Sequence, residues 1–430
     1  MKVTIKGPLR DTIAFVRTLK KRNRVFKKAI LKSLSPAPMN LLAAALHPRE
    51  QRMRITAVKQ DTPSTRTYRL EPEDEKDSLA FFRAGQYITI EETVEGTPVS
   101  RPFSISSTPD EAAQNNFYEV TIKTGEDGFF APWSQREWQV GTRLTCSEPS
   151  GTFYYEPLRD TRHVVCLAGG SGITPFRSIL RDSLHHYPDV RFTLLYGVTG
   201  PNELIFGNEL SALQESYPDR FSLVRVFSEE TEQDRVHSGA GQQNETGFIT
   251  AELIRKYIPK RGGKSGAKTN EEPALPSVFI CGPPAMYDFV SCELEAFSLP
   301  PRRLREENYG HSAADPAQVG RDNKPMGWVI TVKKDHGSRH AGQKKVLTAD
   351  PSETVLTALE RAGLNPPAFC RSGECGWCRS RLVSGEIYVP EENDGRRQAD
   401  LKFGWFHPCS SYPRSDLVIE VPRNPIGRRR

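Results

Sequence analysis

The sequence predicts a multi-domain protein in which an antiparallel β-barrel is followed by a doubly wound α/β domain and a smaller α+β domain. Its 430 residues are too many for one ordinary core. Short alternating strands, separated by Gly, Pro and Asp turns, fill residues 51–157 and are typical of an antiparallel barrel. From His163 to about Tyr309, apolar strands alternate with helix-like segments, which favours a parallel, doubly wound sheet.

We therefore divide the chain into five parts. They are a basic, helical N-terminal extension (1–50), the barrel (51–157), the α/β domain (158–309), a linker containing Gly, Ala and Asp (310–326) and the α+β domain (327–425). In the α+β domain, two strands precede one helix. We expect Asp350 to cap this helix, with Pro351 at its first position, and Gly363 to end it.

The composition is that of a soluble globular protein, with 37% hydrophobic and 26% charged residues. No apolar run approaches the roughly 20 residues of a membrane-spanning helix, and the first residues lack a secretory pattern. We expect a cytoplasmic protein.

The net charge of +6 is concentrated near the N-terminus, because no acidic residue lies between Thr12 and Arg49. Such a basic block suits an acidic protein, a nucleic acid or an anionic membrane surface. The rest of the chain is nearly balanced, so no nucleic acid is expected as a partner. Apolar residues of the block fall near one helical face: Phe15, Leu19, Phe26, Ile30 and Leu34. An interfacial helix, a docking surface for an acidic protein and a loosely packed solvated helix all remain open.

Four of the eight cysteines follow the pattern C-x4-C-x2-C with one distant cysteine: Cys370, Cys375, Cys378 and Cys409. This spacing is that of a plant-type 2Fe–2S centre. Gly373 and Gly376 allow the loop to curl and turn its amide N–H groups toward inorganic sulfide. The nearest competitor is zinc, but zinc sites usually have two separated C-x2-C pairs and only one is present. Three other cysteines are expected to be ordinary core thiols: Cys146, Cys166 and Cys292.

A second motif, Arg101-Pro102-Phe103-Ser104, is expected to bind a flavin. A flavin needs a cation for its phosphate, an aromatic wall for its rings and a hydroxyl near its reactive nitrogen. Arg101 and Phe103 share one face of a strand, and Ser104 follows them. Because an arginine followed by a strand is commonplace, this string alone leaves an ordinary structural strand equally open.

The third motif, Leu167–Pro175, lies where an apolar strand runs into a helix. Its glycines let the backbone approach a pyrophosphate, and the helix N-terminus adds partial positive charge. A second piece, Cys281–Met286, also follows a predicted strand. Open α/β sheets bind ligands at the carboxyl ends of such strands, which predicts one nucleotide site from both pieces.

These motifs, in this order, resemble the ferredoxin–NADP reductase family, whose flavin domain carries R-x-[YF]-[ST] on a six-stranded barrel. The last unit resembles a plant-type ferredoxin, which implies a β-grasp fold. The resemblance implies cofactor contacts for Arg101, Pro102, Phe103, Ser104, Gly128, Phe129, Gly151, Thr152, Gly169, Gly170, Gly172, Ile173, Thr174, Pro175, Cys281, Gly282, Pro283 and Met286. It favours FAD over FMN, although Ala131 stands where many members have Ser or Thr.

The same resemblance gives four candidate catalytic residues: Ser104, Cys281, Glu307 and Tyr309. Cys281 matches the cysteine beside the nicotinamide, although by itself it would be interpreted as a buried structural thiol. Glu307 and Tyr309 match a chain ending in which the aromatic residue approaches the flavin ring.

The nucleotide is expected to be NADH, with NADPH as the alternative. A 2′-phosphate needs fixed cations, most often Arg. Relatives that use NADP often carry Arg after the Tyr-Gly strand end and again in an S-R-E stretch, where this chain reads Val198-Thr199 and Ser228-Glu229-Glu230.

The order of the parts implies that electrons pass from NADH through the flavin and the 2Fe–2S cluster to an external metalloprotein. This arrangement resembles the reductase components of oxygenases and hydroxylases. Two alternatives stay open. The acceptor could be a corrinoid or haem protein, or the chain could be a redox-sensing subunit.

Overall fold

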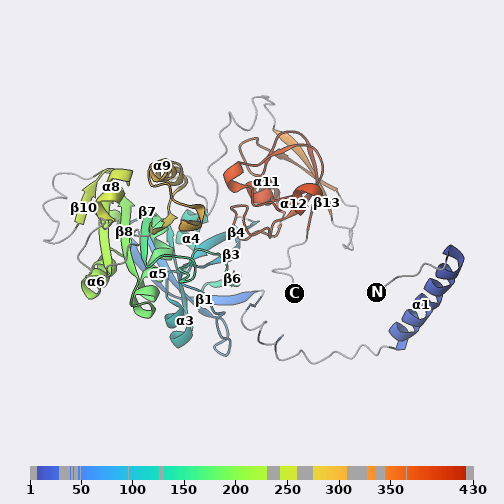
Figure 1. The fold of residues 1–430 in the computed structure, drawn as a ribbon, viewed down its shortest axis with the longest axis horizontal. Coiled ribbons are helices and arrows are strands. Elements are labelled where there is room, and N and C mark those ends of the chain that lie inside the picture. Colours follow the sequence, from blue (N-terminus) through green and yellow to red (C-terminus); the bar gives the residue numbers. More distant parts are fainter. Residues whose placement is uncertain are drawn as a thin grey trace. The chain divides into compact units, whose positions relative to one another are not determined.

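The computed structural model describes residues 7–28, 39, 42, 47–48, 50–94, 96–124, 130–229, 243–258, 275–307, 327–334, 344–364 and 366–422. The chain divides into two compact units, Met1–Leu46 and His47–Arg430 (Figure 1). Three predicted site residues, Gly128, Phe129 and Tyr309, lie outside the described residues, as does the linker 310–326.

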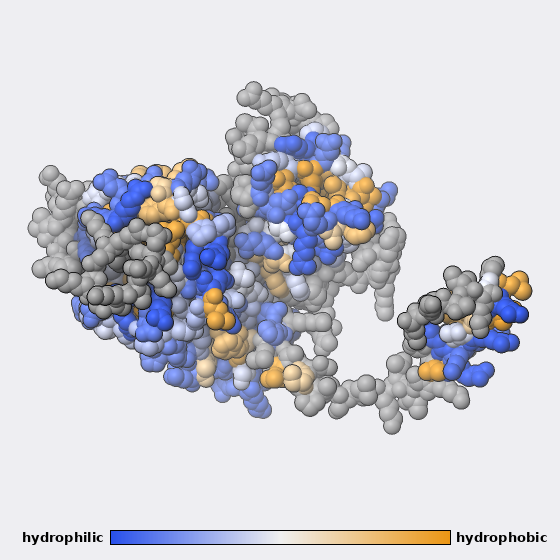
Figure 2. Space-filling model, viewed as in Figure 1, coloured by the Kyte–Doolittle hydropathy of each residue, from blue (hydrophilic) through white to orange (hydrophobic). Residues whose placement is uncertain are grey.

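The first unit contains the helix α1 (Pro8–Lys28). Two apolar residues of this helix are exposed, Leu9 by 78% and Phe15 by 63%. Hydrophilic and hydrophobic residues are interspersed on its visible face (Figure 2). Ile30 and Leu34, which complete the predicted apolar face, lie outside the described residues. Among the described helices, none combines the length and apolar character needed to cross a membrane.

An antiparallel six-stranded sheet follows, as predicted, in the order β4-β3-β6-β1-β2-β5. Its strands are β1 (Gln51–Thr62), β2 (Thr65–Pro72), β3 (Tyr87–Val94), β4 (Thr97–Ser104), β5 (Tyr118–Lys123) and β6 (Arg143–Cys146). The sheet curls until its two edges meet, because Ile105, just beyond β4, pairs with Val120 of β5. Alternate side chains of these strands face one buried core. Two short helices flank the sheet: α3 (Pro109–Asn115) and α4 (Phe130–Glu137).

The α/β domain has a parallel sheet in the order β10-β9-β8-β7-β11-β12. Its strands are β7 (His163–Gly169), β8 (Arg191–Val198), β9 (Phe221–Phe227), β10 (Gln243–Thr246), β11 (Ser277–Cys281) and β12 (Leu304–Glu307). Its helices are α5 (Ile173–His186), α6 (Gly207–Ser216), α8 (Ala251–Tyr257) and α9 (Pro284–Glu295). Two hydrophobic cores cover opposite faces, one with α5 and α6 and one with α8 and α9 (Figure 1). The doubly wound prediction is confirmed.

In this sheet the strand order reverses at β7, which lies between β8 and β11. The predicted nucleotide motifs follow these two strands, β7 and β11. Ligands of doubly wound sheets bind at this reversal, outside the carboxyl ends of the strands. The topology therefore brings the two motifs to the expected place.

The C-terminal domain combines a five-stranded sheet, in the order β14-β13-β19-β15-β17, with short helices. The elements are β13 (Trp328–Lys334), β14 (Lys344–Ala349), α11 (Val355–Arg361), β15 (Ser380–Ser384), β16 (Ile387–Tyr388), α12 (Gln398–Lys402), β17 (Trp405–Phe406), β18 (Tyr412–Pro413) and β19 (Leu417–Val421). Strands β16 and β18 form a separate pair. The helix α11 packs into the core of this domain.

The predicted start of α11 is wrong. The helix begins at Val355 and is capped by Thr354, whose hydroxyl accepts from the Thr357 amide. Asp350 instead forms a local turn, because its carboxylate accepts from the Ser352 amide at 2.8 Å. The predicted end is confirmed, since Gly363 has a φ of +70° and follows Ala362, the residue that caps the helix.

Candidate functional site

The four predicted ligand cysteines lie together. The sulfurs of Cys378 and Cys409 are 3.3 Å apart, and the thiol of Cys370 contacts those of Cys375 and Cys409. Three of the four are buried, and Cys375 is exposed. A loop and one distant segment thus supply a compact set of sulfur ligands, as a 2Fe–2S cluster requires.

Backbone amides of the loop point at these sulfurs. Cys370 Sγ accepts from the amides of Ser372 and Cys375 at 3.4 Å, and Cys375 Sγ accepts from the Trp377 amide at the same distance. Hydrogen bonds from the thiols of Cys375 and Cys409 hold the pKa of Cys370 well below its usual range. Donors that favour a thiolate suit metal ligation, because the thiolate is the ligand form.

Both predicted loop glycines adopt the left-handed conformation. Gly373 has a φ of +83°, and a Cβ there would lie 2.4 Å from the Asn393 carbonyl oxygen. The Gly373 carbonyl accepts from Nδ1 of His407 at 2.6 Å, which joins the loop to the segment of the fourth cysteine. The residues therefore fit a 2Fe–2S cluster in donor set, curvature and amide direction.

The predicted flavin motif occupies the end of β4. Arg101 is mostly buried, donates to the Ser100 carbonyl at 2.8 Å and lies over the Phe130 ring at 5.9 Å. Phe103 packs against Phe130 with ring centroids 5.8 Å apart. A cation, an aromatic wall and the buried hydroxyl of Ser104 are therefore grouped as a flavin requires.

The turn carrying Gly151 and Thr152 is bonded to β3 beside this motif. Tyr87 of β3 exchanges two backbone hydrogen bonds with Ser150. Gly151 has a φ of +105°, and a Cβ there would lie 2.9 Å from the Tyr87 ring. Burial raises the pKa of Tyr87, and nearby Cys370 and Cys375 raise it further. Tyr87 therefore lies between the flavin motif and the cysteine loop.

The two nucleotide motifs interlock through their glycines. A Cβ on Gly172 would lie 2.1 Å from the carbonyl oxygen of Cys281. A Cβ on Gly169 would lie 2.5 Å from Sδ of Met286 and 2.9 Å from Cδ of Pro283. Gly170 supplies a φ of +52° at the start of the turn into α5. Only glycines allow the two turns to pack this closely and leave a backbone cradle for a pyrophosphate.

Cys281 lies at the centre of this strand edge. It pairs with Ala168 of β7 on one side and with Glu307 of β12 on the other. Burial and the Glu307 carboxylate raise the pKa of the Cys281 thiol well above its usual value, so the thiol stays neutral. The Tyr287 hydroxyl donates to the Glu307 carbonyl and accepts from the Gly282 amide, which ties the turn to β12.

The flavin and nucleotide motifs meet at Ser104. The Thr174 hydroxyl at the start of α5 lies 3.1 Å from Ser104 Oγ and 3.0 Å from the Ser171 carbonyl. Both side chains are buried. Two motifs that are 70 positions apart in the sequence therefore form one site.

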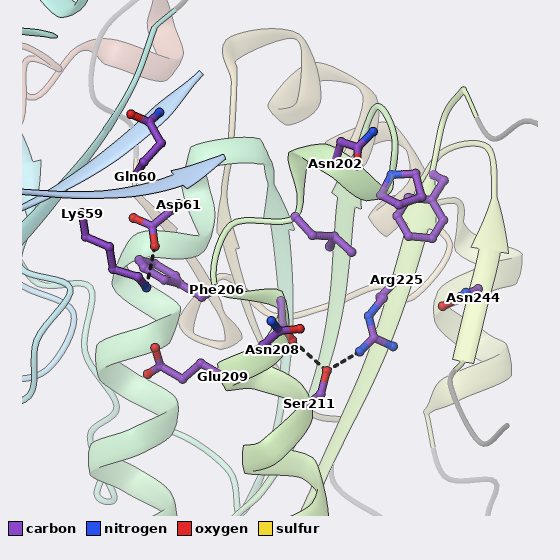
Figure 3. Close-up of a pocket in the computed structure, with 14 residues that line it drawn as sticks. Lys59, Gln60, Asp61, Asn202, Phe206, Asn208, Glu209, Ser211, Arg225 and Asn244 are labelled. Carbon is purple, nitrogen blue, oxygen red and sulfur yellow. Dashed lines mark hydrogen bonds and ion pairs between the residues drawn. The ribbon is translucent and has the colours of Figure 1, made fainter. Parts of the chain in front are cut away.

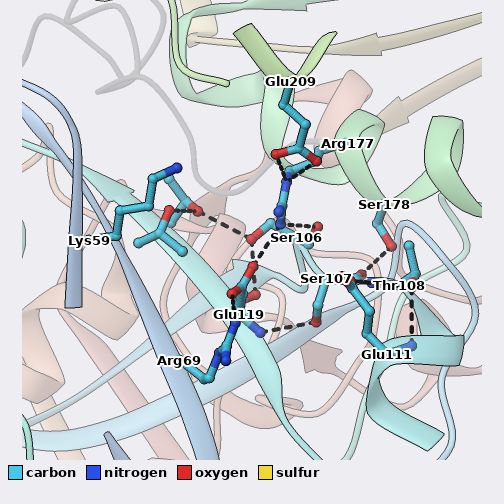
Figure 4. Close-up of polar contacts among 12 residues, drawn as sticks. Lys59, Arg69, Ser106, Ser107, Thr108, Glu111, Glu119, Arg177, Ser178 and Glu209 are labelled. Carbon is cyan, nitrogen blue, oxygen red and sulfur yellow. Dashed lines mark hydrogen bonds and ion pairs between the residues drawn. The ribbon is translucent and has the colours of Figure 1, made fainter. Parts of the chain in front are cut away.

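A buried polar network fixes the two domains on each other (Figure 4). Arg177 of α5 donates to the Ser106 carbonyl at 2.9 Å and to Glu119 of β5 at 2.8 Å, and it also pairs with Glu209 of α6. Ser178 adds a 2.6 Å bond to the Ser107 carbonyl. A charge-assisted network of this kind orients the α5 N-terminus toward the flavin motif.

A pocket of about 630 Å³ lies at the side of the α/β sheet that carries α6 (Figure 3). Its lining includes Lys59, Asn202, Asn208, Arg225 and Asn244. Arg225 is buried and donates to Ser211 Oγ at 2.7 Å. This pocket also includes Phe227, the last residue of β9, so it adjoins the segment in which NADP-dependent relatives carry Arg.

Family models match three successive parts of the chain. Residues 52–155 match an oxidoreductase FAD-binding domain, residues 166–292 an oxidoreductase NAD-binding domain and residues 338–414 a 2Fe-2S iron-sulfur cluster binding domain. The chain is a ferredoxin–NADP reductase-like protein with a fused C-terminal 2Fe–2S domain. It belongs with the NAD(P)H-dependent flavin/2Fe–2S oxidoreductases of this reductase family.

Several relatives of this iron–sulfur flavoprotein reductase are components of oxygenase systems. It is 29% identical over 347 residues to a component of the 1,2-phenylacetyl-CoA epoxidase of Escherichia coli, covering 79% of this chain and 88% of the relative. It is 26% identical over 376 residues to the glycine betaine monooxygenase reductase subunit of Chromohalobacter salexigens, covering 86% and 94%. The solved structure of phthalate dioxygenase reductase shares the fold, with a TM-score of 0.56, 20% identity and coverage of 87% and 98%.

The reductase also contains site features that no motif predicts. An aromatic residue in a strand and an arginine in a helix are common, so the sequence does not single out Tyr87 or Arg177. Cys146 and Cys166 are buried core thiols, as predicted. The prediction for Cys292 is wrong, because this thiol is exposed on α9.

Proposed function

We propose that this reductase oxidises NADH, carries its electrons through FAD and a 2Fe–2S cluster and delivers them to the oxygenase component of a multicomponent system. One observation supports the proposal most strongly. The flavin strand β4 touches the nucleotide site through Ser104 and Thr174, 3.1 Å apart, and touches the cysteine loop through Ser100 and Arg371, 3.2 Å apart. Three sites that work in series thus share one strand.

The protein residues bind, orient and exclude water. Arg101 supplies the cation for the flavin phosphate, and Phe103 supplies the apolar wall. Ser104 would offer its hydroxyl to the reactive edge of the flavin. Cys281 and Glu307, which are paired on neighbouring strands, would line the nicotinamide side, where the raised pKa of the Cys281 thiol keeps that group uncharged. When bound, a flavin accepts two electrons together as hydride and releases them singly to a one-electron cluster.

FAD is the flavin that the chain is proposed to take. The barrel matches a model of FAD-binding domains, and this supports the preference drawn from the motif. Cofactor release by acid and mass measurement of the supernatant distinguishes FAD from FMN.

NADH is the proposed nucleotide. The segment after β9 begins Ser228-Glu229 and has a carboxylate where NADP-dependent relatives carry Arg. Two cations line the adjoining pocket, and both have protein partners, since Arg225 donates to Ser211 and Lys59 pairs with Asp61. A kcat/KM ratio in favour of NADH supports this assignment, and a ratio in favour of NADPH contradicts it.

An oxygenase is proposed as the electron acceptor in preference to a corrinoid or haem protein, because both relatives named above serve an epoxidase or a monooxygenase. The basic helix α1 is proposed to contact an acidic partner or an anionic membrane from the cytoplasmic side. Pelleting with anionic vesicles, with and without residues 1–50, distinguishes the two.

The test of the proposed function is reduction of a one-electron acceptor protein by NADH. The full chain with reconstituted cofactors is expected to reduce cytochrome c in a reaction that needs both flavin and cluster. An enzyme that consumes NADH at the same rate with and without its cluster, when cytochrome c is the acceptor, contradicts the proposed route.

A further inference from the structure

A buried ion pair lies where the 2Fe–2S domain touches the flavin domain. Arg371, directly after the first ligand cysteine, grips Glu360 of α11 with both terminal nitrogens, at 2.7 and 2.9 Å. The two side chains are only 12% and 7% exposed. A forked arginine–carboxylate pair of this kind has a fixed geometry, so it defines the direction of both side chains.

The pair also reaches across to the other domain. Nη1 of Arg371 donates to the carbonyl of Ser100 in β4 at 3.2 Å. That same carbonyl accepts from Arg101, the flavin-motif cation, whose Nη1 lies 3.8 Å from the second oxygen of Glu360. Two arginines from two domains therefore share one carboxylate and one carbonyl oxygen.

The Glu360 carboxylate balances the positive charges of two arginines at the domain boundary. Arg101 and Arg371 carry like charges in a buried setting, and the Glu360 carboxylate contacts both of them. Without that carboxylate, the two guanidinium groups repel each other across the domain boundary. A further contact, from the Thr89 hydroxyl to the Phe369 carbonyl at 3.4 Å, is a neutral hydrogen bond and is weaker.

We propose that Glu360 and Arg371 form an interdomain latch that holds the cysteine loop against β4 and orients Arg101 for the flavin. This inference rests on the proposed function, because it assigns these two residues a positioning role in electron transfer from flavin to cluster. Neither residue touches the reacting atoms. The latch closes the 2Fe–2S domain onto the same strand that holds the flavin, so docking and flavin binding reinforce each other.

Glu360→Gln tests the latch, with Glu353→Gln as the matched control. Glu353 lies on the same segment and pairs with Arg361, and its hydrogen bonds to other described residues stay within the 2Fe–2S domain. The holoenzyme of each variant is compared with the wild type in two measurements. Hydrogen–deuterium exchange reports protection of the β4 amides, and stopped-flow absorbance separates flavin reduction by NADH from cluster reduction by the flavin.

In Glu360→Gln, β4 is expected to exchange faster and electron transfer from flavin to cluster to slow by about tenfold or more, because small displacements of reacting groups cost large factors in rate. The affinity for flavin is expected to fall, whereas the flavin that stays bound is expected to be reduced by NADH near the wild-type rate. Glu353→Gln is expected to match the wild type in both measurements. Equal exchange and equal cluster reduction in the two variants overturn the latch.

A second variant is the control for loss of the cluster, because Glu360→Gln leaves the Arg371 charge without its carboxylate next to a ligand cysteine. The double variant Glu360→Leu with Arg371→Met removes both charges and leaves neither member of the pair buried as an unpaired ion. If it keeps its cluster absorbance and β4 exchanges faster, the latch is supported. If it keeps its cluster and β4 exchange is unchanged, the latch is wrong. Failure of NADH to reduce the wild type refutes the proposed function instead, and the exchange comparison still decides the latch.

Discussion

Gly172 gives the sharpest test of how the nucleotide site is built. Its φ of −63° is one that alanine adopts freely, so a Gly172→Ala substitution acts through sterics alone. The added Cβ would lie 2.1 Å from the Cys281 carbonyl oxygen and 2.7 Å from the Gly282 amide nitrogen. Both contacts are backbone, and ordinary van der Waals contact begins at 3.4 Å. The two turns must therefore separate by about 1.3 Å, which is the difference between the 3.4 Å of ordinary contact and the 2.1 Å to the Cys281 oxygen.

This separation displaces the nucleotide cradle from the flavin strand. Overpacking of this size costs about 1–3 kcal/mol of stability. A displacement of about 1 Å lowers reaction rates by about 100-fold. We expect Gly172→Ala to retain flavin and cluster, because the atoms nearest the added Cβ belong to Cys281 and Gly282 and not to the strand β4 or the cysteine loop, and to lose about 100-fold in kcat/KM for flavin reduction by NADH.

Stopped-flow reduction of the flavin under anaerobic conditions measures this loss. Gly200→Ala is the matched control, because its φ is −161° and a Cβ there meets no atom within 4 Å. That variant is expected to behave as wild type. A Gly172→Ala enzyme that NADH reduces within about threefold of the wild-type rate would refute the interlocked-turn geometry.

Three further predictions concern the cluster, the domain interface and pH. Cys409→Ser is expected to abolish the visible absorbance of the 2Fe–2S cluster, while NADH still bleaches the flavin. The control Cys292→Ser, at an exposed thiol, is expected to keep the cluster absorbance and the flavin bleaching. A cluster spectrum that persists in Cys409→Ser refutes the ligand assignment. Arg177→Met removes the pairs of Arg177 with Glu119 and Glu209 and leaves Glu119 paired with Arg69 alone. We expect this variant to be destabilised by about 2 kcal/mol in denaturant titrations, and a loss below about 1 kcal/mol contradicts a stabilising network. Burial lowers the pKa of His163 to about 4, so the unfolded chain binds a proton from about pH 6.5 downward before the folded chain does. The free energy of unfolding that this histidine contributes above pH 6.5 is therefore lost as the pH falls toward 4, by about 3 kcal/mol in total. Denaturation curves at pH 7 and 4.5 measure this loss, which is expected to be smaller in His163→Gln. An equal loss of stability in the variant and the wild type contradicts the assignment.

The features best predicted from the sequence are those in which a local spacing carries the chemistry. The cysteine pattern works this way, because three ligands lie in one loop whose curvature depends on Gly373 and Gly376. The glycines of the nucleotide motif are equally informative, since Gly169 and Gly172 have no room for a Cβ. In both motifs the glycines are visible in the sequence, and each marks a backbone position where the fold has no space for a side chain or needs a positive φ.

The features that the sequence does not reveal depend on contacts between distant segments. Tyr87 matters because the turn at Gly151 and the cysteine loop converge on it, and no local pattern records that meeting. Arg177 likewise meets Glu119 across 58 positions. The latch residues Glu360 and Arg371 look like an ordinary helix charge and a loop arginine until β4 is placed beside them.

The misplaced helix start shows a different limit. Asp350 and Thr354 are both favourable caps, and the sequence pattern does not decide between them. The decision is tertiary, because the Val355 amide donates to the Ser411 carbonyl at 2.8 Å, next to the segment of the fourth cysteine. Docking of the ligand segment thus fixes where the helix begins.

An anaerobic titration with NADH, followed by visible absorbance and electron paramagnetic resonance, tests the central claim most directly. A flavin that takes two electrons and a cluster that takes one require about 1.5 equivalents of NADH per chain. We predict bleaching of the flavin together with the appearance of a reduced 2Fe–2S signal at that stoichiometry. Bleaching that stops at about one equivalent, with no cluster signal, would contradict a serial path from nucleotide through flavin to cluster.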